Sequence, residues 1–252
     1  METTNNTVLI TGGSAGIGLE IARQFLKNGN HVIITGRSSK RLQQAAEELG
    51  NVTAIQFDVT REGDVETLVT RLESEFKRLN VVINNAGNAF YYRLGEDTGA
   101  FEKAREEMLT NYLSIIRLNE KLLPLLKQQP VAAIVNVSSI VAFAGSFTLA
   151  TYAASKAALH SYTNSLRVVL HRNTNVKVFE LMPPLVNTEF SKAIGGERGI
   201  SPAAVAEDLL NAMEENRYEI HTGNTTELYK LFLSSPEAAV NYMNPVEALA
   251  VI

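Results

Sequence analysis

A tyrosine and a lysine four residues apart are the side chains best placed for acid–base chemistry. Tyr152 and Lys156 lie in the segment Tyr-Ala-Ala-Ser-Lys, which begins a predicted helix running to about His171. Residues with this spacing lie on one face of a helix, one turn apart. A neighbouring ammonium lowers the pKa of a phenol, so Tyr152 could act as a general acid or base near neutral pH. An ordinary surface pair has the same spacing, and the motif therefore needs support from other residues.

Two polar residues upstream supply that support. Ser139 follows the predicted strand 132–137, and a hydroxyl at the carboxyl end of a parallel strand can donate to a substrate carbonyl. The adjacent Ser138 is either an alternative for this role or a turn hydroxyl. Asn111 lies among apolar residues of the predicted helix 103–126, where its amide must be hydrogen-bonded. A polar helix face is the alternative interpretation of Asn111.

A glycine-rich turn follows the first predicted strand and opens the first helix. Its sequence is Thr-Gly-Gly-Ser-Ala-Gly-Ile-Gly, and the residues expected to contact a cofactor are Gly12, Ser14, Gly16, Ile17 and Gly18. Glycines let the backbone approach a pyrophosphate, whose charge is met by free N–H groups at the helix N-terminus. The spacing differs from G-x-G-x-x-G, because three residues separate Gly12 from Gly16. A tight strand–helix turn without a ligand is the alternative.

The residues after the second predicted strand favour NADP(H) over NAD(H). Folds that bind NAD place an acid about 20 residues beyond the glycines, on the ribose hydroxyl. Here the strand ends Thr-Gly-Arg-Ser, and no acid follows before Glu47. The Arg37 guanidinium can bind a 2′-phosphate with two hydrogen bonds, whereas a carboxylate would repel it. Lys40 and Arg41 are interpreted as an exposed basic helix start.

Short apolar runs alternate with longer helix-like segments along the chain. The strands are predicted at 7–11, 31–35, 52–57, 81–84, 132–137, 176–181 and, weakly, 218–222. Most of these runs are continuously apolar, which is typical of parallel strands covered on both faces. The pattern predicts a three-layer α/β fold with a doubly wound, mainly parallel sheet. We expect one domain over 1–252, with a candidate substrate lid at 189–200 and a helical tail at 201–252.

Composition excludes several classes of function. The 252 residues carry a formal net charge of −4, which lacks the basic footprint of a nucleic-acid binder. The chain has no cysteine, which excludes disulfides and thiolate metal sites, and its four histidines have no metal-ligand spacing. The sequence has neither a signal-like segment nor an apolar run long enough to span a bilayer. We therefore expect a cytoplasmic protein without a metal, a nucleic-acid partner or a membrane span.

The chain resembles the short-chain dehydrogenase/reductase family over essentially its whole length. The matching elements are the glycine turn, the run Asn-Asn-Ala-Gly at 84–87, and the set Asn111, Ser139, Tyr152 and Lys156. The resemblance implies a seven-stranded Rossmann sheet and hydride transfer. It also implies that Tyr152 donates the proton in reduction, Ser139 orients the carbonyl, Lys156 binds the nicotinamide ribose and lowers the tyrosine pKa, and Asn111 holds a water.

The resemblance extends to further cofactor contacts, with one departure. It places Asp58 near the adenine and Asn85 near the adenosine ribose, while Asp58 could equally cap a helix together with Thr60. Val186 and Thr188 match residues that hold the nicotinamide carboxamide. Pro184 stands where the family has glycine, and because proline lacks an N–H, any amide contact there is lost. The double proline resembles the DltE-like oxidoreductase subgroup.

These features predict an NADP(H)-dependent oxidoreductase that interconverts a carbonyl and an alcohol on a small molecule. A non-catalytic NADP(H) sensor or scaffold on the same fold is the alternative. The aromatic residues expected to line the substrate pocket, with core or subunit contact as the alternative for each, are Phe90, Tyr91, Tyr92, Phe143 and Phe147. The resemblance implies a homodimer or homotetramer formed through helices. His160, two helical turns past Tyr152, is expected at a subunit contact, with a place near the site as the alternative. A solvated face is predicted for the Glu106-Glu107 pair.

Overall fold

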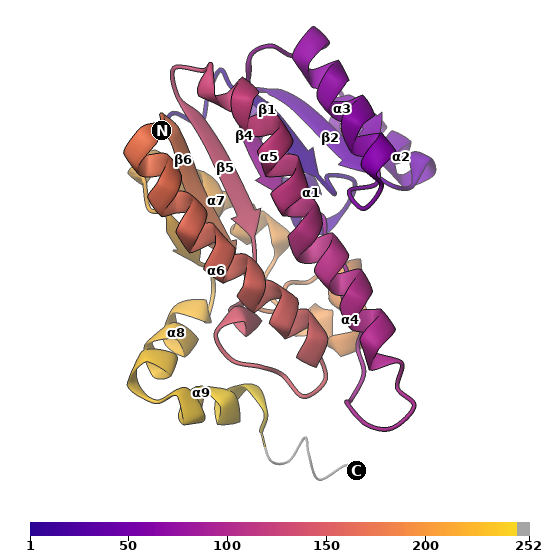
Figure 1. Cartoon of the computed structure of the whole chain (residues 1–252), viewed down its shortest axis with the longest axis vertical. Coiled ribbons are helices and arrows are strands. Elements are labelled where there is room, and N and C mark those ends of the chain that lie inside the picture. Colours follow the sequence, from indigo (N-terminus) through magenta and orange to yellow (C-terminus); the bar gives the residue numbers. More distant parts are fainter. Residues whose placement is uncertain (246–252) are drawn as a thin grey trace.

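The computed structural model describes residues 1–245 and contains a seven-stranded sheet in the order β3-β2-β1-β4-β5-β6-β7 (Figure 1). Every neighbouring pair of strands is parallel, and the prediction of a doubly wound parallel sheet is confirmed. The strands are β1 (Thr7–Thr11), β2 (His31–Gly36), β3 (Thr53–Gln56), β4 (Leu79–Asn84), β5 (Ala132–Val137), β6 (Val176–Met182) and β7 (Glu219–His221).

Helices cover both faces of the sheet, as Figure 1 shows. They are α1 (Gly16–Lys27), α2 (Ser39–Leu49), α3 (Glu62–Glu75), α4 (Ala100–Met108), α5 (Ser114–Lys127), α6 (Ala150–Asn173), α7 (Pro202–Glu215), α8 (Thr225–Ser234) and α9 (Pro236–Met243). The predicted tail thus contains β7 as well as helices, and its residues 246–252 lie outside the described chain. No helix of the described part is long and apolar enough to cross a bilayer.

The alternation of side chains along each strand produces two hydrophobic cores. In β1, Val8 and Ile10 pack with α1, α2 and α7 on one face, while Leu9 packs with α3 and α5 on the other. Successive side chains of a strand point to opposite faces, so a strand buried on both sides must be apolar at every position. This explains the continuously apolar runs in the sequence.

One row of polar residues crosses the sheet on the α5 and α6 face. Asn84, Asn136, Glu180 and Glu219 are register partners on the four consecutive strands β4, β5, β6 and β7. We call these four residues the polar row. The first three are buried, and a buried polar group is costly unless it is hydrogen-bonded.

Each member of the polar row bonds a side chain from the helices above it. Asn84 donates to Asn119 of α5 at 2.9 Å, and Asn136 donates to Thr163 of α6 at 2.9 Å. Within the row, Asn84 also donates to Asn136 at 2.8 Å. Glu180 is hydrogen-bonded to His160, and Glu219 accepts a hydrogen bond from Arg167; both partners belong to α6. The row therefore determines where α6 lies over the sheet.

The predicted helix 103–126 is not one regular helix. It consists of α4, a π-helical turn η1 (Leu109–Leu113) and α5. A π-helical turn contains one residue more than an α-helical turn, and such bulges are frequent at functional sites. Asn111 lies in the middle of η1 and is fully buried.

Replacing the amide at the start of the polar row tests its contribution to stability. We expect Asn84→Leu to lower the free energy of unfolding by about 2–4 kcal/mol, because two buried carboxamide oxygens lose their donor. Denaturant unfolding measures this change. Asn51→Leu, at an exposed position, is the control and should stay within about 0.5 kcal/mol of the parent. An equally small effect of Asn84→Leu would contradict the assigned role.

Candidate active site

The carboxyl ends of β4 and β5 and the first turns of α6 bring the four predicted catalytic residues together. The Ser139 hydroxyl, which follows β5, lies beside the Tyr152 phenol and acts to lower its pKa. Lys156 lies one turn further along α6, with its Nζ 5.5 Å from the centre of the Tyr152 ring. Asn111 of η1 donates to Ser155 at 2.9 Å, which joins it to the same turn of α6.

Lys156 is buried and has a lowered pKa. Its Nζ donates to the carbonyl oxygen of Val137, the last residue of β5, at 2.8 Å. Burial lowers the pKa of Lys156 to about 8, and the negative charge of Glu180 opposes that change. An ammonium with this pKa still predominates over the free amine at neutral pH.

The pKa of Tyr152 differs from the expectation based on the Tyr-x-x-x-Lys spacing. Burial raises the pKa of the phenol well above its ordinary value of 10.0; the nearby Ser139 hydroxyl opposes this change, and the charge of Glu107 adds to it. The expected lowering by Lys156 is absent because the ammonium lies over the ring and bonds Val137. The protein's own groups therefore keep the phenol protonated.

The glycine turn between β1 and α1 leaves no room for side chains. Gly12 and Gly16 have φ angles of +67° and +56°, which strain any residue with a side chain. A Cβ at Gly18 would lie 2.4 Å from the Asn85 side chain. Asn85 donates its amide to the carbonyl oxygens of Thr11 and Gly12 at 3.0 and 3.1 Å. In this structure the Asn85 side chain holds the glycine turn against the end of β4.

The N-terminus of α1 has the features of an anion site. Its N-cap residue is Ala15, no described side chain caps the first turn, and no acidic residue lies in it. The N–H groups of such a turn and the helix dipole attract an anion. Together with the glycines around it, this turn fits the pyrophosphate of a dinucleotide cofactor.

The residues predicted to bind the rest of the cofactor surround the same edge of the sheet. Ser14 lies against the end of β2, since a Cβ at Gly36 would be 3.1 Å from its hydroxyl, and Arg37 follows as an exposed residue. Asp58 accepts hydrogen bonds from the backbone N–H and the hydroxyl of Thr60 at 3.0 and 2.8 Å. It therefore stabilises the turn before α3, and the N-cap of that helix is Arg61. Ile17 packs partly buried against the core.

The segment after β6 reaches back to the glycine turn. Val186 is buried and forms an isolated bridge with Ile200, while a Cβ at Gly16 would lie 3.1 Å from the Thr188 methyl. The predicted lid contains two 3-10 helices, η3 (Glu189–Ile194) and η4 (Gly196–Arg198). Phe190 of η3 is 54% exposed, and its ring centre lies 6.2 Å from that of Tyr152. This aromatic neighbour of Tyr152 was absent from the predicted pocket residues.

One prediction for an individual residue is wrong, and the structure adds contacts for two others. Glu107 is not on a solvated face: it is fully buried and accepts a hydrogen bond from the Phe90 N–H at 2.7 Å. His160 bonds Glu180 and contacts the Phe143 ring while its side chain stays 24% exposed, so the subunit contact remains a prediction. Phe143 is packed among aromatic residues, so the core alternative holds for it.

Sequence reasoning also missed Glu180, although a signal was present. It is the one carboxylate of β6, and an acid in a buried strand requires partners. Glu107 had a comparable signal, because it lies four residues before Asn111 and hence on the same face of the helix.

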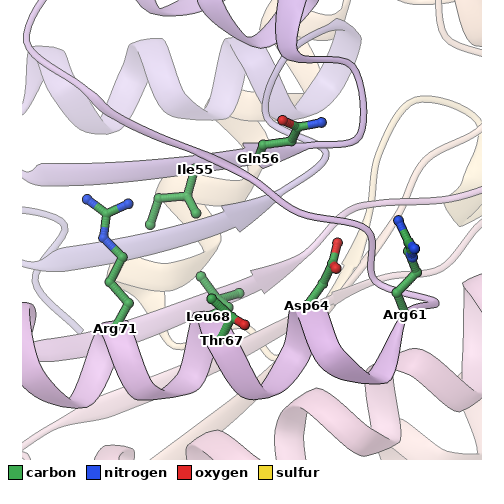
Figure 2. A pocket seen from close by; sticks show the side chains of 7 residues that line it. All are labelled: Ile55, Gln56, Arg61, Asp64, Thr67, Leu68 and Arg71. Carbon is green, nitrogen blue, oxygen red and sulfur yellow. The ribbon is translucent and has the colours of Figure 1, made fainter.

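A hollow of about 470 Å³ lies elsewhere, between β3 and α3 (Figure 2). Its lining residues are Ile55, Gln56, Arg61, Asp64, Thr67, Leu68 and Arg71. None of them belongs to the predicted site, and Arg71 is already ion-paired with Glu75 at 3.0 Å. The hollow therefore contains none of the four predicted catalytic residues, although its Asp64 accepts a hydrogen bond from the Asp58 N–H at 2.9 Å.

Comparison with known proteins agrees with this geometry. The short chain dehydrogenase family model matches residues 6–199. The uncharacterized oxidoreductase DltE of Bacillus subtilis (strain 168) is 40% identical over 225 residues, covering 87% of this chain and 89% of that protein. The NADP-dependent 3-hydroxy acid dehydrogenase YdfG of Salmonella typhi is 38% identical over 192 residues, covering 73% and 74%.

Among solved structures, a short chain dehydrogenase from Burkholderia cenocepacia J2315 in complex with NADP has a TM-score of 0.86 at 25% identity. The match covers 96% of this chain and 99% of that one. The family model, these relatives and the shared parallel sheet lead to one conclusion. The chain belongs to the short-chain dehydrogenase/reductase family of oxidoreductases.

Proposed function

We propose that the protein is an NADP(H)-dependent reductase or dehydrogenase that interconverts a carbonyl and an alcohol, with Tyr152 as the general acid or base. The observation that carries the proposal is that the Ser139 hydroxyl, the Tyr152 phenol and the buried Lys156 converge in one place. A protein that only bound the cofactor would need no such arrangement around a phenol.

The glycine turn and the segment after β6 would hold the cofactor from two sides. The N–H groups of the first turn of α1 would bind the pyrophosphate, and Val186 and Thr188 would hold the nicotinamide end. When bound, the nicotinamide ring supplies or accepts the hydride. Arg37 would bind the 2′-phosphate that distinguishes NADP(H) from NAD(H).

The residues beside the reacting carbon would each have a separate role in proton transfer, binding or positioning. In reduction, Tyr152 Oη gives its proton to the carbonyl oxygen as that oxygen gains negative charge, and Ser139 donates a hydrogen bond to the same oxygen. The ammonium of Lys156 would bind the ribose of the nicotinamide. Asn111 holds the loop after β4 to α6 through its bonds with Asn88 and Ser155, at 2.8 and 2.9 Å.

The proposal includes a cytoplasmic location and a symmetric homo-oligomer. Three apolar side chains are exposed beside or along α5 and α6: Leu113, Val168 and Val169 at 48%, 53% and 57%. Exposed apolar side chains on neighbouring helices suit contact with the same helices of a second copy. The small molecule that is reduced or oxidised would reach Tyr152 past the exposed ring of Phe190.

Removing the phenolic hydroxyl separates turnover from cofactor binding. We expect Tyr152→Phe to lower kcat for NADPH-dependent carbonyl reduction by at least about 100-fold, because the proton donor is lost. The Kd for NADPH, measured by fluorescence titration, should change little. NADPH oxidation with a panel of aldehydes, ketones and quinones measures turnover. A mutant as active as the parent refutes the mechanism, and a parent that binds NADPH but turns over no carbonyl favours the sensor alternative.

Removing the proposed 2′-phosphate contact tests the cofactor preference. We expect Arg37→Ala to raise the Kd for NADPH by about 10-fold or more, because a charge-assisted hydrogen bond is lost, with less than about a 2-fold change for NADH. Arg71→Ala, which removes an arginine of α3, is the matched control and should alter neither value. Equal weakening of both cofactors by Arg37→Ala would contradict the preference.

Two glycines with similar backbone angles allow a matched test of the cofactor turn. Gly12 and Gly29 have φ angles of +67° and +74°, but only a Cβ at Gly12 would meet other atoms, with the Ala86 Cα at 3.0 Å. We expect each Ala substitution to lower the free energy of unfolding by about 1–2 kcal/mol, because both positions are left-handed.

Only Gly12→Ala should weaken NADPH binding, by about 10-fold or more, since it alone displaces the turn. Fluorescence titration of both variants, with urea unfolding alongside, measures the two effects. Unchanged NADPH affinity in folded Gly12→Ala would show that the cofactor does not use this turn.

A further inference from the structure

A buried carboxylate lies behind the candidate catalytic residues and has no part in the mechanism above. Glu180 of β6 is 0% exposed. Its Oε1 accepts a hydrogen bond from the Ser138 hydroxyl at 2.6 Å, and its Oε2 lies 2.9 Å from Nδ1 of His160. Three elements therefore meet at one side chain: the end of β5, the middle of β6 and the second turn of α6 after Tyr152.

Both neighbours of Glu180 are attached to catalytic candidates. Ser138 immediately precedes Ser139, and its own backbone N–H donates to the Leu181 carbonyl of β6 at 2.9 Å. His160 lies one helical turn after Lys156 and two turns after Tyr152, on the same face of α6. Lys156 in turn bonds the carbonyl of Val137, the residue before Ser138. Glu180 and Lys156 thus each connect the 137–138 segment to the 156–160 turn of α6.

The arrangement is different from a hydrolytic triad. In such a triad the serine is bonded to the histidine, which removes its proton. Here Ser138 donates to the carboxylate, so its oxygen is not activated as a nucleophile. The set is suited to holding segments in place and to supplying a negative charge.

We propose that Glu180 is a positioning residue for the reaction. Its carboxylate ties the segment that carries Ser139 to the face of α6 that carries Tyr152 and Lys156, and it places a buried negative charge beneath that face. The inference rests on the proposed function, because that function gives the ammonium its task. It assigns a role to Glu180 of β6, which the proposed mechanism does not otherwise use.

The charged groups around Glu180 and Lys156 agree with the proposal. The carboxylate of Glu180 raises the pKa of Lys156 against the lowering by burial, and its hydrogen bond raises the pKa of His160. The other titratable or charged groups that face the pair come from α4, α6 and β7: Glu107, Tyr152, Arg167, Glu219 and His221. Of all these acids, only Glu180 acts on Lys156.

The test compares three substitutions by a readout that needs no turnover. Protein labelled with ¹³C-lysine gives a Cε resonance for Lys156, assigned with Lys156→Arg, and its pH titration reports the pKa directly. In Glu180→Gln, which keeps an oxygen for Ser138 but removes the charge, we expect the pKa of Lys156 to fall from about 8 by about one unit. Glu180→Asp keeps the charge and should leave the pKa of Lys156 near the parent value.

Glu219→Gln is the matched control, because Glu219 is the register partner of Glu180 on β7 and bonds Arg167 instead. It should leave the pKa of Lys156 unchanged. In the active enzyme the alkaline limb of the kcat profile should move to lower pH in Glu180→Gln by the same amount, since turnover requires the ammonium. A purely structural role would lower kcat at every pH and leave the limb in place.

An unchanged pKa of Lys156 in folded Glu180→Gln would overturn the inference, as would an equal shift in Glu219→Gln. Thermal unfolding confirms that each variant is folded, and Glu180→Asp allows the same comparison if Glu180→Gln does not fold. In that case, a pKa of Lys156 in Glu180→Asp that differs from the parent by one unit would overturn it. If the parent enzyme reduces no carbonyl, the proposed function fails while the lysine titration still decides the role of Glu180.

Discussion

The requirement that buried polar groups be hydrogen-bonded governs how α6 lies on the sheet. The polar row crosses the face beneath this helix, and its members bond Thr163, His160 and Arg167 of α6. Apolar packing alone tolerates small slides and rotations between a helix and a sheet, whereas hydrogen bonds between buried groups do not. Tyr152 and Lys156 are carried by the same helix, so the row also determines where these two side chains stand relative to Ser139.

The electrostatic state of the site follows from burial more than from the pairing of charges. Burial keeps the proton on the Tyr152 phenol and weakens the hold of Lys156 on its own proton. The phenol is thus ready to donate, and the ammonium remains the main form at neutral pH. Glu107 and Glu180 act on these groups in different ways: Glu107 raises the pKa of the phenol, and Glu180 raises that of the ammonium.

Local patterns in the sequence were sufficient for the order of strands and helices and for the parallel sheet. The same patterns located the glycine turn and the helix that begins near Tyr152, because each depends on residues close together in the chain. They failed where the outcome depends on register between distant segments. Glu180 meets His160 and Ser138 only because β6 pairs with β5 in one register and α6 has one rotation above them.

Two wrong expectations have the same cause, because each depends on a contact between segments that are distant in the sequence. Glu107 was taken with Glu106 as part of a solvated face, but the loop after β4 folds over it and supplies the Phe90 N–H. The lowered pKa expected for Tyr152 assumed that helical spacing places an ammonium beside the phenolic oxygen. Spacing fixes the face of the helix, while the direction of the lysine side chain depends on the Val137 carbonyl, which belongs to another element.

The π-helical turn η1 has a consequence for how this chain can change during evolution. It holds one residue beyond the ordinary helical repeat, and Asn111 lies inside it. The wider turn absorbs this residue, so the apolar stripe of α5, including Leu118 and Leu122, still faces the sheet. Deleting one residue there would leave a regular helix with that stripe in place, but it would displace Asn111 from its bonds to Asn88 and Ser155. The length of this turn is therefore constrained by the position of Asn111.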